Sequence, residues 1–337
     1  MAQISVLLPF RNSESTLEAC LDSIARQSFH DYELLAVNDH SNDNSGTLVE
    51  ARATDDPRIR LIDNRGRGLV DALNHGLSQA DSPLIARMDA DDIMHPERLQ
   101  RQHDHLQRHP ELSLLGCATR LFPEHLILNG YREYIRWQNG CNTPEQIADE
   151  IYIESPFAHP GVVFRKHCVE RIGGYREGPF PEDYELWLRL HRTGHRMAKL
   201  PDVLLDWRES PNRTSRVDLR YSRDAFDQLR ADYLVHDPRL LKRRDRLAIW
   251  GAGRKTRRRC RPLLRKGFEP VAWIDIDPKK IGNRLEGVPV VAPQWLERQE
   301  RKPFVLVYVA NHGARELIAH DLHRLGYKRG KDYLVVG

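Results

Sequence analysis

The alternation of short apolar runs with helix-forming segments constrains the fold of this chain more than any other feature. Residues 4–10 form a continuous apolar run, which is typical of a strand buried on both faces. The same signals predict strands at 32–37, 59–62 and 84–86, and helices that begin near 14, 47 and 69. Strands that alternate with helices predict parallel βαβ units and therefore an α/β fold.

Polar clusters follow these strands at the points where each strand ends. They are Arg11-Asn12, Asn38-Asp39, Asn64-Arg65 and the run from Asp89 to Asp92. In a parallel sheet the carboxyl ends of the strands meet at one edge, and ligands bind there. The pattern therefore predicts a binding site at this edge, formed by all four clusters.

The last cluster holds three carboxylates within four residues, Asp89, Asp91 and Asp92. Like charges this close cannot all ionise freely unless a cation lies among them. Hard oxygen ligands suit Mg²⁺ or Mn²⁺, which then carries substrate phosphates. The alternative is a solvated acidic turn that caps the helix expected at residues 97–109.

Composition excludes several other classes of protein. Of the 337 residues, 40% are hydrophobic and 30% charged, as in a soluble globular protein. No apolar run approaches the roughly 18–20 residues that cross a bilayer. The sequence begins in a strand without a basic, apolar leader, and its five cysteines include no CxxC pair, so we expect a cytoplasmic protein without a zinc site.

The last third of the chain predicts a second domain. Residues 221–245 are polar and are expected to form a helix and linker. Strands at 247–250, 270–274 and 304–310 follow, the last ending in Asn311-His312-Gly313. A glycine-rich turn at Gly251, with Asp275 more than 20 residues later, resembles the Rossmann pattern, although Thr256 replaces its third glycine. This domain could be a nucleotide-binding or oxidoreductase module, or one that serves only for packing.

Together, the motifs of residues 4–215 resemble those of the family 2 glycosyltransferases, which have the GT-A fold. The motifs are Val6-Leu7-Leu8-Pro9-Phe10-Arg11-Asn12, Val37-Asn38-Asp39, Asn64-Arg65-Gly66, Met88-Asp89-Ala90-Asp91-Asp92, His159-Pro160, Glu182-Asp183 with Leu186-Trp187, and Trp207-Arg208. The resemblance implies a GT-A domain over residues 1–220, a helical linker over 221–245 and a Rossmann-like domain over 246–337.

The resemblance also implies roles on the donor side. Asp91 and Asp89 match the DxD motif that holds Mg²⁺ or Mn²⁺, and Asp39 matches the carboxylate that receives the N3–H of the donor base. The family usually has Asp where this chain has Asn38. Further residues expected to bind the donor are Pro9, Arg11, Arg67, Asp89, His159 and Arg208. Arg67 could instead be a solvated loop cation, and His159 and Arg208 could be structural.

On the acceptor side, inversion at the anomeric carbon requires a base opposite the leaving group. Asp183 matches the family's base, and Glu182 would orient Asp183 or the acceptor. The alternative is that this acidic pair only complements the dipole of the following helix.

The expected activity is transfer of a sugar from a nucleotide-diphosphate donor, UDP- or dTDP-linked, to a glycan or lipid-linked acceptor in surface glycan biosynthesis. Between Lys242 and Lys266, 12 of 25 residues are Lys or Arg, a density that suits peripheral contact with an anionic membrane face or a solvated helix face. Aromatic residues are not interleaved with this run, so no nucleic-acid partner is expected. The chain also lacks the QxxRW motif of processive synthases.

Overall fold

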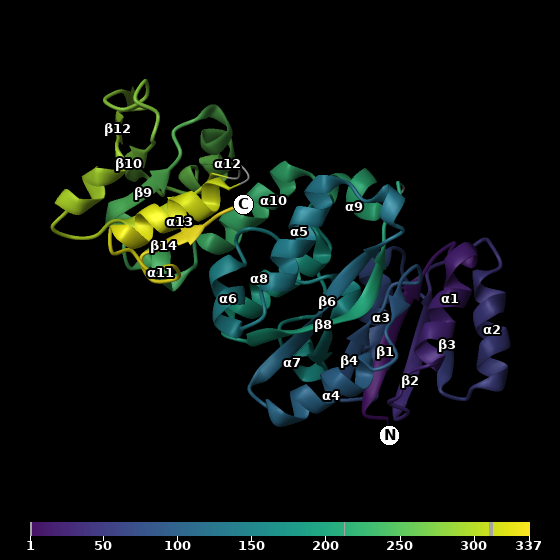
Figure 1. The fold of residues 1–337 in the computed structure, drawn as a ribbon. Coiled ribbons are helices and arrows are strands. Elements are labelled where there is room, and N and C mark those ends of the chain that lie inside the picture. The colour runs from purple at the N-terminus through teal and green to yellow at the C-terminus, as the bar shows by residue number, and fades with distance from the viewer. Residues whose placement is uncertain (1, 212, 310–312) are drawn as a thin grey trace. The chain divides into compact units, whose positions relative to one another are not determined.

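The computed structural model describes residues 2–211, 213–309 and 313–337. The contacts among its residues divide the chain into two compact units (Figure 1). The first unit comprises Met1–Ile147, Ser155–Gly178 and Glu182–Asp218. The second unit comprises Ala148–Glu154, Pro179–Pro181 and Leu219–Gly337.

The first unit is an α/β structure around one eight-stranded sheet in the order β3-β2-β1-β4-β7-β6-β8-β5. Strands β3, β2, β1 and β4 are parallel, and β7 is antiparallel to β4. The strands are β1 (Ile4–Phe10), β2 (Tyr32–Asn38), β3 (Ile59–Asp63), β4 (Leu84–Arg87), β5 (Ile93–Met94), β6 (Leu112–Phe122), β7 (Val163–Arg165) and β8 (Arg196–Arg208). The helices are α1 (Glu14–Ala25), α2 (Ser45–Asp55), α3 (Leu69–Gln79), α4 (Arg98–Arg108), α5 (Asn129–Gly140), α6 (Pro144–Glu150), α7 (Lys166–Arg171), α8 (Glu182–Arg192) and α9 (Thr214–Val217).

The two faces of β1 are covered by different helices, which explains why six of its seven residues are apolar. Val6 and Leu8 pack into the core that contains the apolar face of α1. On the other face, α3 approaches so closely that a Cβ atom on Gly76 would collide with Leu7 and Val37. All seven residues of β1 are buried. The alternating elements and the mostly parallel sheet confirm the predicted fold class.

The second unit has a six-stranded sheet in the order β11-β12-β10-β9-β13-β14. Its five parallel strands run 3-2-1-4-5 in chain order, the order of doubly wound nucleotide-binding folds. The strands are β9 (Leu247–Trp250), β10 (Pro270–Ile274), β11 (Arg284–Leu285), β12 (Val288–Val291), β13 (Phe304–Val307) and β14 (Tyr333–Val335). The helices are α10 (Arg223–Leu234), α11 (Pro238–Leu241), α12 (Arg254–Leu264) and α13 (Ala314–Arg324).

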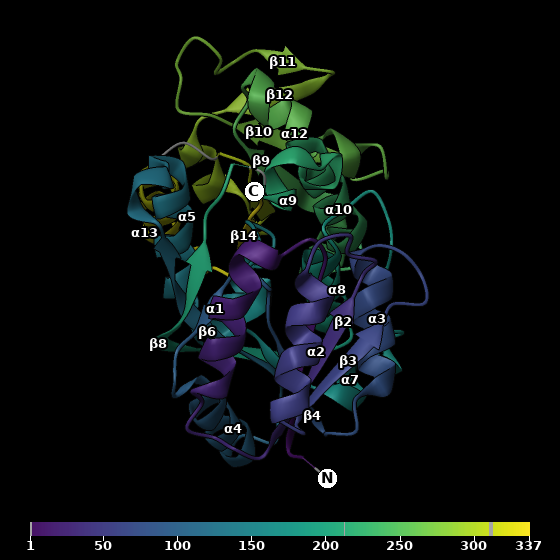
Figure 2. The same cartoon turned by 90° about the vertical axis from the view of Figure 1, so that its right-hand side faces the viewer.

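Helices α12 and α13 lie on opposite sides of the second sheet (Figure 2). The connections that contain them leave the central strands in opposite directions, so right-handed crossovers place them on opposite faces. Helix α10, expected from the sequence as part of a linker, packs against α12 within this unit.

Two details of the second unit differ from the sequence prediction. The strand expected at residues 304–310 ends at Val307, and its expected continuation into Asn311 and His312 lies outside the described residues. Strands β11, β12 and β14 were not predicted, because each has only two to four residues and β12 contains a proline. Among the described residues, none of the helices has the length and apolar character needed to cross a bilayer.

Candidate active site

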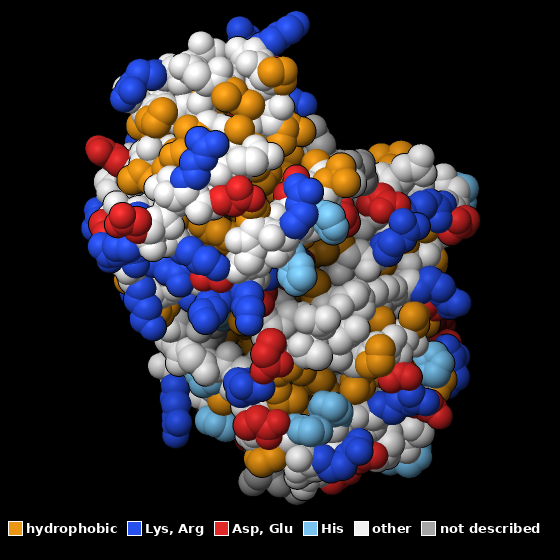
Figure 3. Space-filling model, turned by 60° about the vertical axis from the view of Figure 1, so that its left-hand side comes forward, with side chains coloured by type: hydrophobic (Ala, Val, Ile, Leu, Met, Phe, Trp, Pro, Cys, Tyr) orange, Lys and Arg blue, Asp and Glu red, His pale blue; other side chains and the backbone are white. Residues whose placement is uncertain are grey.

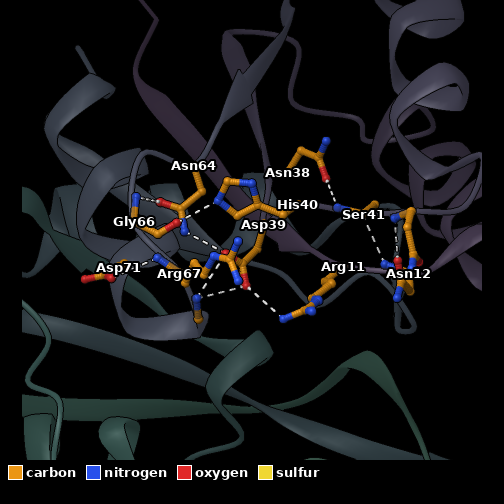
Figure 4. Close-up of polar contacts among 12 residues, drawn as sticks. Arg11, Asn12, Asn38, Asp39, His40, Ser41, Asn64, Gly66, Arg67 and Asp71 are labelled. Atoms are coloured by element: carbon orange, nitrogen blue, oxygen red, sulfur yellow. Dashed lines mark hydrogen bonds and ion pairs between the residues drawn. The ribbon is translucent and has the colours of Figure 1, made fainter.

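The loop after β2 holds Asp39 in a nearly closed pocket of hydrogen-bond donors (Figure 4). Asp39 is 6% exposed, and its carboxylate accepts hydrogen bonds from the Gly68 backbone N–H at 3.0 Å and from Asn64 Nδ2 at 2.8 Å. Arg11 reaches toward the same carboxylate, with Nη1 4.0 Å from Oδ2. The ends of β1, β2 and β3 therefore meet at one carboxylate, as the strand-end clusters predict.

Cross-links between the strand-end loops hold this region in shape. Asn12 adopts a left-handed backbone conformation with φ 51°, and its Oδ1 accepts from the Asn42 backbone N–H at 2.9 Å. His40, with φ 56°, places Nε2 2.8 Å from the carbonyl oxygen of Gly66. Asn38 Oδ1 accepts from the Ser41 backbone N–H at 3.0 Å, so this side chain stabilises the loop.

The other residues expected around the nucleotide differ in exposure. Pro9 is buried in β1, where its backbone lies opposite Val37. The side chain of Arg11 is 60% exposed, and Arg67 is also exposed, with its backbone N–H donated to Asp71. Both arginine side chains are therefore exposed enough to contact an anion, although Arg11 also faces Asp39.

The three carboxylates after β4 converge. Asp89, Asp91 and Asp92 each present an oxygen, and these oxygens lie within 4.8 Å of one another. Burial, followed by repulsion from Asp89, raises the pKa of Asp91 to about 6. Burial and both neighbouring carboxylates also raise the pKa of Asp92 well above its usual range. Such mutual repulsion is what a bound cation would relieve.

The environment of Asp92 fits a divalent metal ion. Asp92 is fully buried, and its Oδ1 accepts from the Arg208 backbone N–H at 2.7 Å. Its Oδ2 is buried without a hydrogen-bond donor among the described residues. Arg208 also donates a hydrogen bond from Nε to the carbonyl oxygen of Asp91 at 2.6 Å. Arg208, which was expected to bind the nucleotide-sugar donor, therefore stabilises the carboxylate cluster. Mg²⁺ and Mn²⁺ prefer oxygen ligands such as carboxylates. The cluster offers such oxygens, and Asp92 Oδ2 has no hydrogen-bond partner in the described part of the chain that would compete with a metal ion.

Arg87, the last residue of β4, supplies a buried positive charge beside this cluster. It is 1% exposed, and its Nη1 forms an ion pair with Asp89 Oδ1. Burial alone would lower the pKa of Arg87, but the facing Asp89, Tyr175 and Glu182 raise it instead. Arg87 is therefore a permanent cation that interacts with acidic groups from two separate motifs.

The Glu182-Asp183 pair lies in the first turn of α8, rather than before the helix as the sequence suggested. Burial, followed by repulsion from Glu182, raises the pKa of Asp183 to about 8. His159 is buried, with Nε2 3.0 Å from the Tyr175 hydroxyl and Nδ1 3.8 Å from Glu182 Oε1. Burial and then Arg87 lower the pKa of His159 well below its usual value, so its imidazole is neutral.

The metal-type cluster and the Glu182-Asp183 pair share electrostatic neighbours. Arg87 lowers the pKa of both Asp91 and Asp183, against the larger effect of burial in each case. Burial raises the pKa of Tyr175, and both Asp183 and Asp89 raise it further. The two motifs, which are far apart in the sequence, therefore share Arg87 and Tyr175 as electrostatic neighbours.

Three residues of this site were not singled out from the sequence: Arg87, Tyr175 and Arg213. Arg213 stacks on Trp207, with its guanidinium carbon 3.8 Å from the ring centre, and lowers the pKa of Asp91 against the effect of burial. A signal existed only for Arg87, because a charged residue that ends a buried strand requires a carboxylate partner.

The glycine-rich turn of the second unit is already occupied by the protein's own groups. Asp275, which follows β10, accepts from the Ala252 backbone N–H at 2.9 Å and from the Asp277 backbone N–H at 3.0 Å. Lys280 Nζ donates to the same carboxylate at 3.1 Å. The acid that would bind a ribose in a Rossmann fold thus holds the turn against the following loop.

Comparisons with known proteins agree with this arrangement. The model of "Glycosyl transferase family 2" matches residues 5–173, half of the chain. The amylovoran biosynthesis glycosyltransferase AmsE of Erwinia amylovora is 38% identical over 204 residues, which cover 60% of this chain and 74% of that protein.

Two solved structures show the same fold. TarS of S. aureus, in complex with UDP-GlcNAc, has a TM-score of 0.56 at 18% identity, over 71% of this chain and 67% of that one. The mannosyltransferase PcManGT of Pyrobaculum calidifontis, in complex with GDP-Man and Mn²⁺, has a TM-score of 0.51 at 20% identity, over 79% and 68%. Sequence and fold together establish that this chain belongs to glycosyl transferase family 2.

Proposed function

We propose that this glycosyltransferase is an inverting, metal-dependent enzyme that moves a sugar from a nucleotide-diphosphate donor to a hydroxyl group of a surface glycan or its precursor. The observations that support the proposal are the convergence of the Asp89, Asp91 and Asp92 oxygens, with Arg87 paired to Asp89, and the contacts of His159 with Tyr175 and Glu182. The Asp89–Asp92 carboxylates suit the binding of a cation that carries phosphates, and the Glu182-Asp183 pair can supply the proton acceptor.

On the donor side, Asp39 accepts the N3–H of the base, while Arg11 and Arg67 contribute positive charge beside the nucleotide. Asp91 and Asp89 would hold Mg²⁺ or Mn²⁺, with Asp92 Oδ2, which is unpartnered among the described residues, in support, and Arg208 fixes the backbone of Asp91 through its carbonyl oxygen. A bound metal ion would neutralise the charge that develops on the departing diphosphate. The names of AmsE and of the ligands of TarS and PcManGT support a nucleotide-sugar donor and a surface-glycan product.

On the acceptor side, Asp183 removes the proton of the attacking hydroxyl group, and Glu182 keeps Asp183 oriented. His159, being neutral and bound to Tyr175, positions Glu182 rather than the diphosphate. In this proposal, catalysis takes place in the GT-A domain, residues 1–220, and residues 221–337 take no part in the reaction. Because Asp275 is engaged by its own loop, we propose no second nucleotide-binding activity.

A ligand screen tests the proposal. UDP-, dTDP- and GDP-sugars would each be added to the full chain with and without Mn²⁺, and the thermal midpoint would be measured. A ligand that binds only the native state raises the apparent stability. We expect at least one nucleotide sugar to raise the midpoint only with Mn²⁺, and to be hydrolysed slowly. No Mn²⁺-dependent response to any of them would contradict the proposal.

Replacing Asp39 by Ala should weaken nucleotide binding and leave turnover at saturating donor nearly unchanged. One charge-assisted hydrogen bond contributes roughly 1.5–3 kcal/mol, so we expect about 10- to 150-fold weaker binding of UDP in calorimetry. Asp39→Asn is the matched control, because an amide oxygen can still accept from the base and from Gly68. A large fall in turnover at unchanged affinity would mean that Asp39 takes part in the chemistry.

A further inference from the structure

The basic stretch between Lys242 and Lys266 separates into two groups in the structure. The first group is used within the second unit: Arg243 pairs with Asp332 at 3.0 Å, and Arg244 Nη2 donates to the Gly267 carbonyl oxygen at 2.9 Å. The second group is the set of exposed cations of α12 and its C-cap, Arg254, Lys255, Arg258, Arg261 and Arg265. Two other cations of this stretch are already paired, Arg259 with Asp227 and Lys266 with Asp232.

Three arginines of α12, Arg254, Arg258 and Arg261, form a row with Arg265 at its C-cap, and we call this row the arginine stripe. Their spacing of four, three and four residues places all four on one side of the helix. All four are exposed, whereas Thr256, Cys260 and Leu263 on the opposite side are buried. The helix is thus anchored in the unit by one face and presents the stripe on the other.

The stripe lacks the acidic neighbours that a solvated basic surface normally has. From residue 246 to residue 268 the sequence contains no Asp or Glu. Among the described residues, no carboxylate lies within ion-pair distance of Arg254, Arg261 or Arg265, and Arg258 has only the exposed Asp224 at 3.6 Å. On the face drawn in Figure 3, several Lys and Arg side chains gather in a band, and others lie beside Asp and Glu.

This arrangement is unfavourable for the isolated helix. Like charges three and four residues apart repel each other along the stripe. Arg254 and Lys255 also place positive charge at the helix N-terminus, where the dipole favours negative charge. Nothing within the described part of the unit offsets these repulsions at Arg254, Arg261 and Arg265, so an external anionic surface would stabilise the stripe.

We propose that the arginine stripe docks the protein on the anionic phospholipid headgroups of a bilayer. Eleven residues of helix are about 16 Å long, so the stripe presents a row of cations that suits a surface of laterally mobile anions. The helix carries no aromatic residue on which nucleic-acid bases could stack. Because its apolar side is buried in the unit, the contact is electrostatic and peripheral, without insertion.

Vesicle flotation of the full chain tests this proposal. The probes are vesicles of phosphatidylcholine alone and vesicles with an equal share of phosphatidylglycerol, at low and at high salt. We expect binding to the anionic vesicles only, and its loss in high salt, since screening shortens the range of the attraction. The assay contains no sugar nucleotide, so its failure would leave the proposed transferase activity untouched.

A triple variant, Arg254→Gln, Arg261→Gln and Arg265→Gln, locates the contact. Each cation near an anionic surface contributes about fivefold to binding, so we expect about 10²-fold weaker partitioning. The matched control is Lys328→Gln, Lys331→Gln and Arg298→Gln, which removes three exposed cations elsewhere on the same unit. The control should bind like the wild type, and replacing the three arginines by Lys should retain binding.

Folding is not expected to confuse the result, because the Gln variant removes repulsion and should melt no earlier than the wild type. Three outcomes would overturn the proposal. They are equal binding of the wild type to neutral and anionic vesicles, loss of binding in the control variant alone, and displacement from vesicles by duplex DNA at equimolar phosphate.

Discussion

Asp91→Ala should abolish sugar transfer and eliminate metal-dependent binding of the nucleotide. The variant removes one of three carboxylates whose oxygens converge within 4.8 Å, and with it the ligand proposed to approach the metal most directly. A metal ion contributes several kcal/mol to stabilising charge in the transition state, so transfer should fall by at least about 10³-fold. Calorimetry with UDP or another bound nucleotide, with and without Mn²⁺, measures the binding effect.

The same substitution should leave the fold intact. When the pKa of a carboxyl group is higher in the folded protein than in the unfolded chain, the protein loses stability as the pH rises from the unfolded pKa, near 4, to the folded pKa. For Asp91 that folded value is about 6, so at pH 7 its removal relieves repulsion. The free energy of unfolding should hold or rise. Asp202→Ala, which removes an exposed partner of Arg101 on β8, is the control for charge loss.

The wild-type protein should show the corresponding pH dependence. Because a proton competes with the metal for Asp91, Mn²⁺-dependent nucleotide binding should weaken as pH falls through about 6. Metal-independent binding should change less over that range. Unchanged Mn²⁺-dependent affinity in Asp91→Ala would place the metal on other ligands.

The fold of the first unit could be predicted because its signals are local. Strand β1 is buried along its whole length and six of its seven residues are apolar, so the apolar run in the sequence identified it directly. The strand-end clusters followed from the same pattern, since parallel strands align their carboxyl ends. Asp39 and the carboxylates after β4 were therefore found without knowledge of any long-range contact.

The electrostatic connection between the two motifs could not be predicted, because it depends on contacts across the sheet. Arg87 occupies a strand position, and only the packing of α8 brings Glu182 and Asp183 into its range. Tyr175 lies in a loop and has no sequence pattern that marks it. The same limit applies to the arginine stripe: the sequence showed a basic run, but only the structure separated its paired members from its exposed ones.

Asp183→Asn should lower sugar transfer by at least about 10²–10⁴-fold, the usual contribution of a general base. Asn keeps the size and shape of the side chain but cannot accept the hydroxyl proton. Donor and metal binding should remain near wild type, because Asp91 and Asp39 are unchanged. Slow hydrolysis of the donor by water is expected to persist, since loss of the base affects attack by the acceptor first.

The pH profile provides an independent measurement. Only the ionised carboxylate is a base, and burial with repulsion from Glu182 raises the pKa of Asp183 to about 8. Transfer by the wild type should therefore rise with pH through about 8, and this limb should disappear in Asp183→Asn. A limb that persists in the variant would assign the base to another group, with Glu182 or His159 as the next candidate.

Stability separates catalysis from the alternative, in which the acidic pair only complements the helix dipole. That alternative predicts little kinetic change and a loss of under about 1 kcal/mol in Asp183→Asn. If Asp183 is instead a base with a raised pKa, we expect a large loss of transfer rate and no loss of stability in the variant. The folded protein binds the Asp183 proton more tightly than the unfolded chain, so ionisation lowers stability as pH rises from about 4 to about 8. At pH 8 the variant should thus unfold no more easily than the wild type while transferring far more slowly, a combination that a dipole role cannot produce.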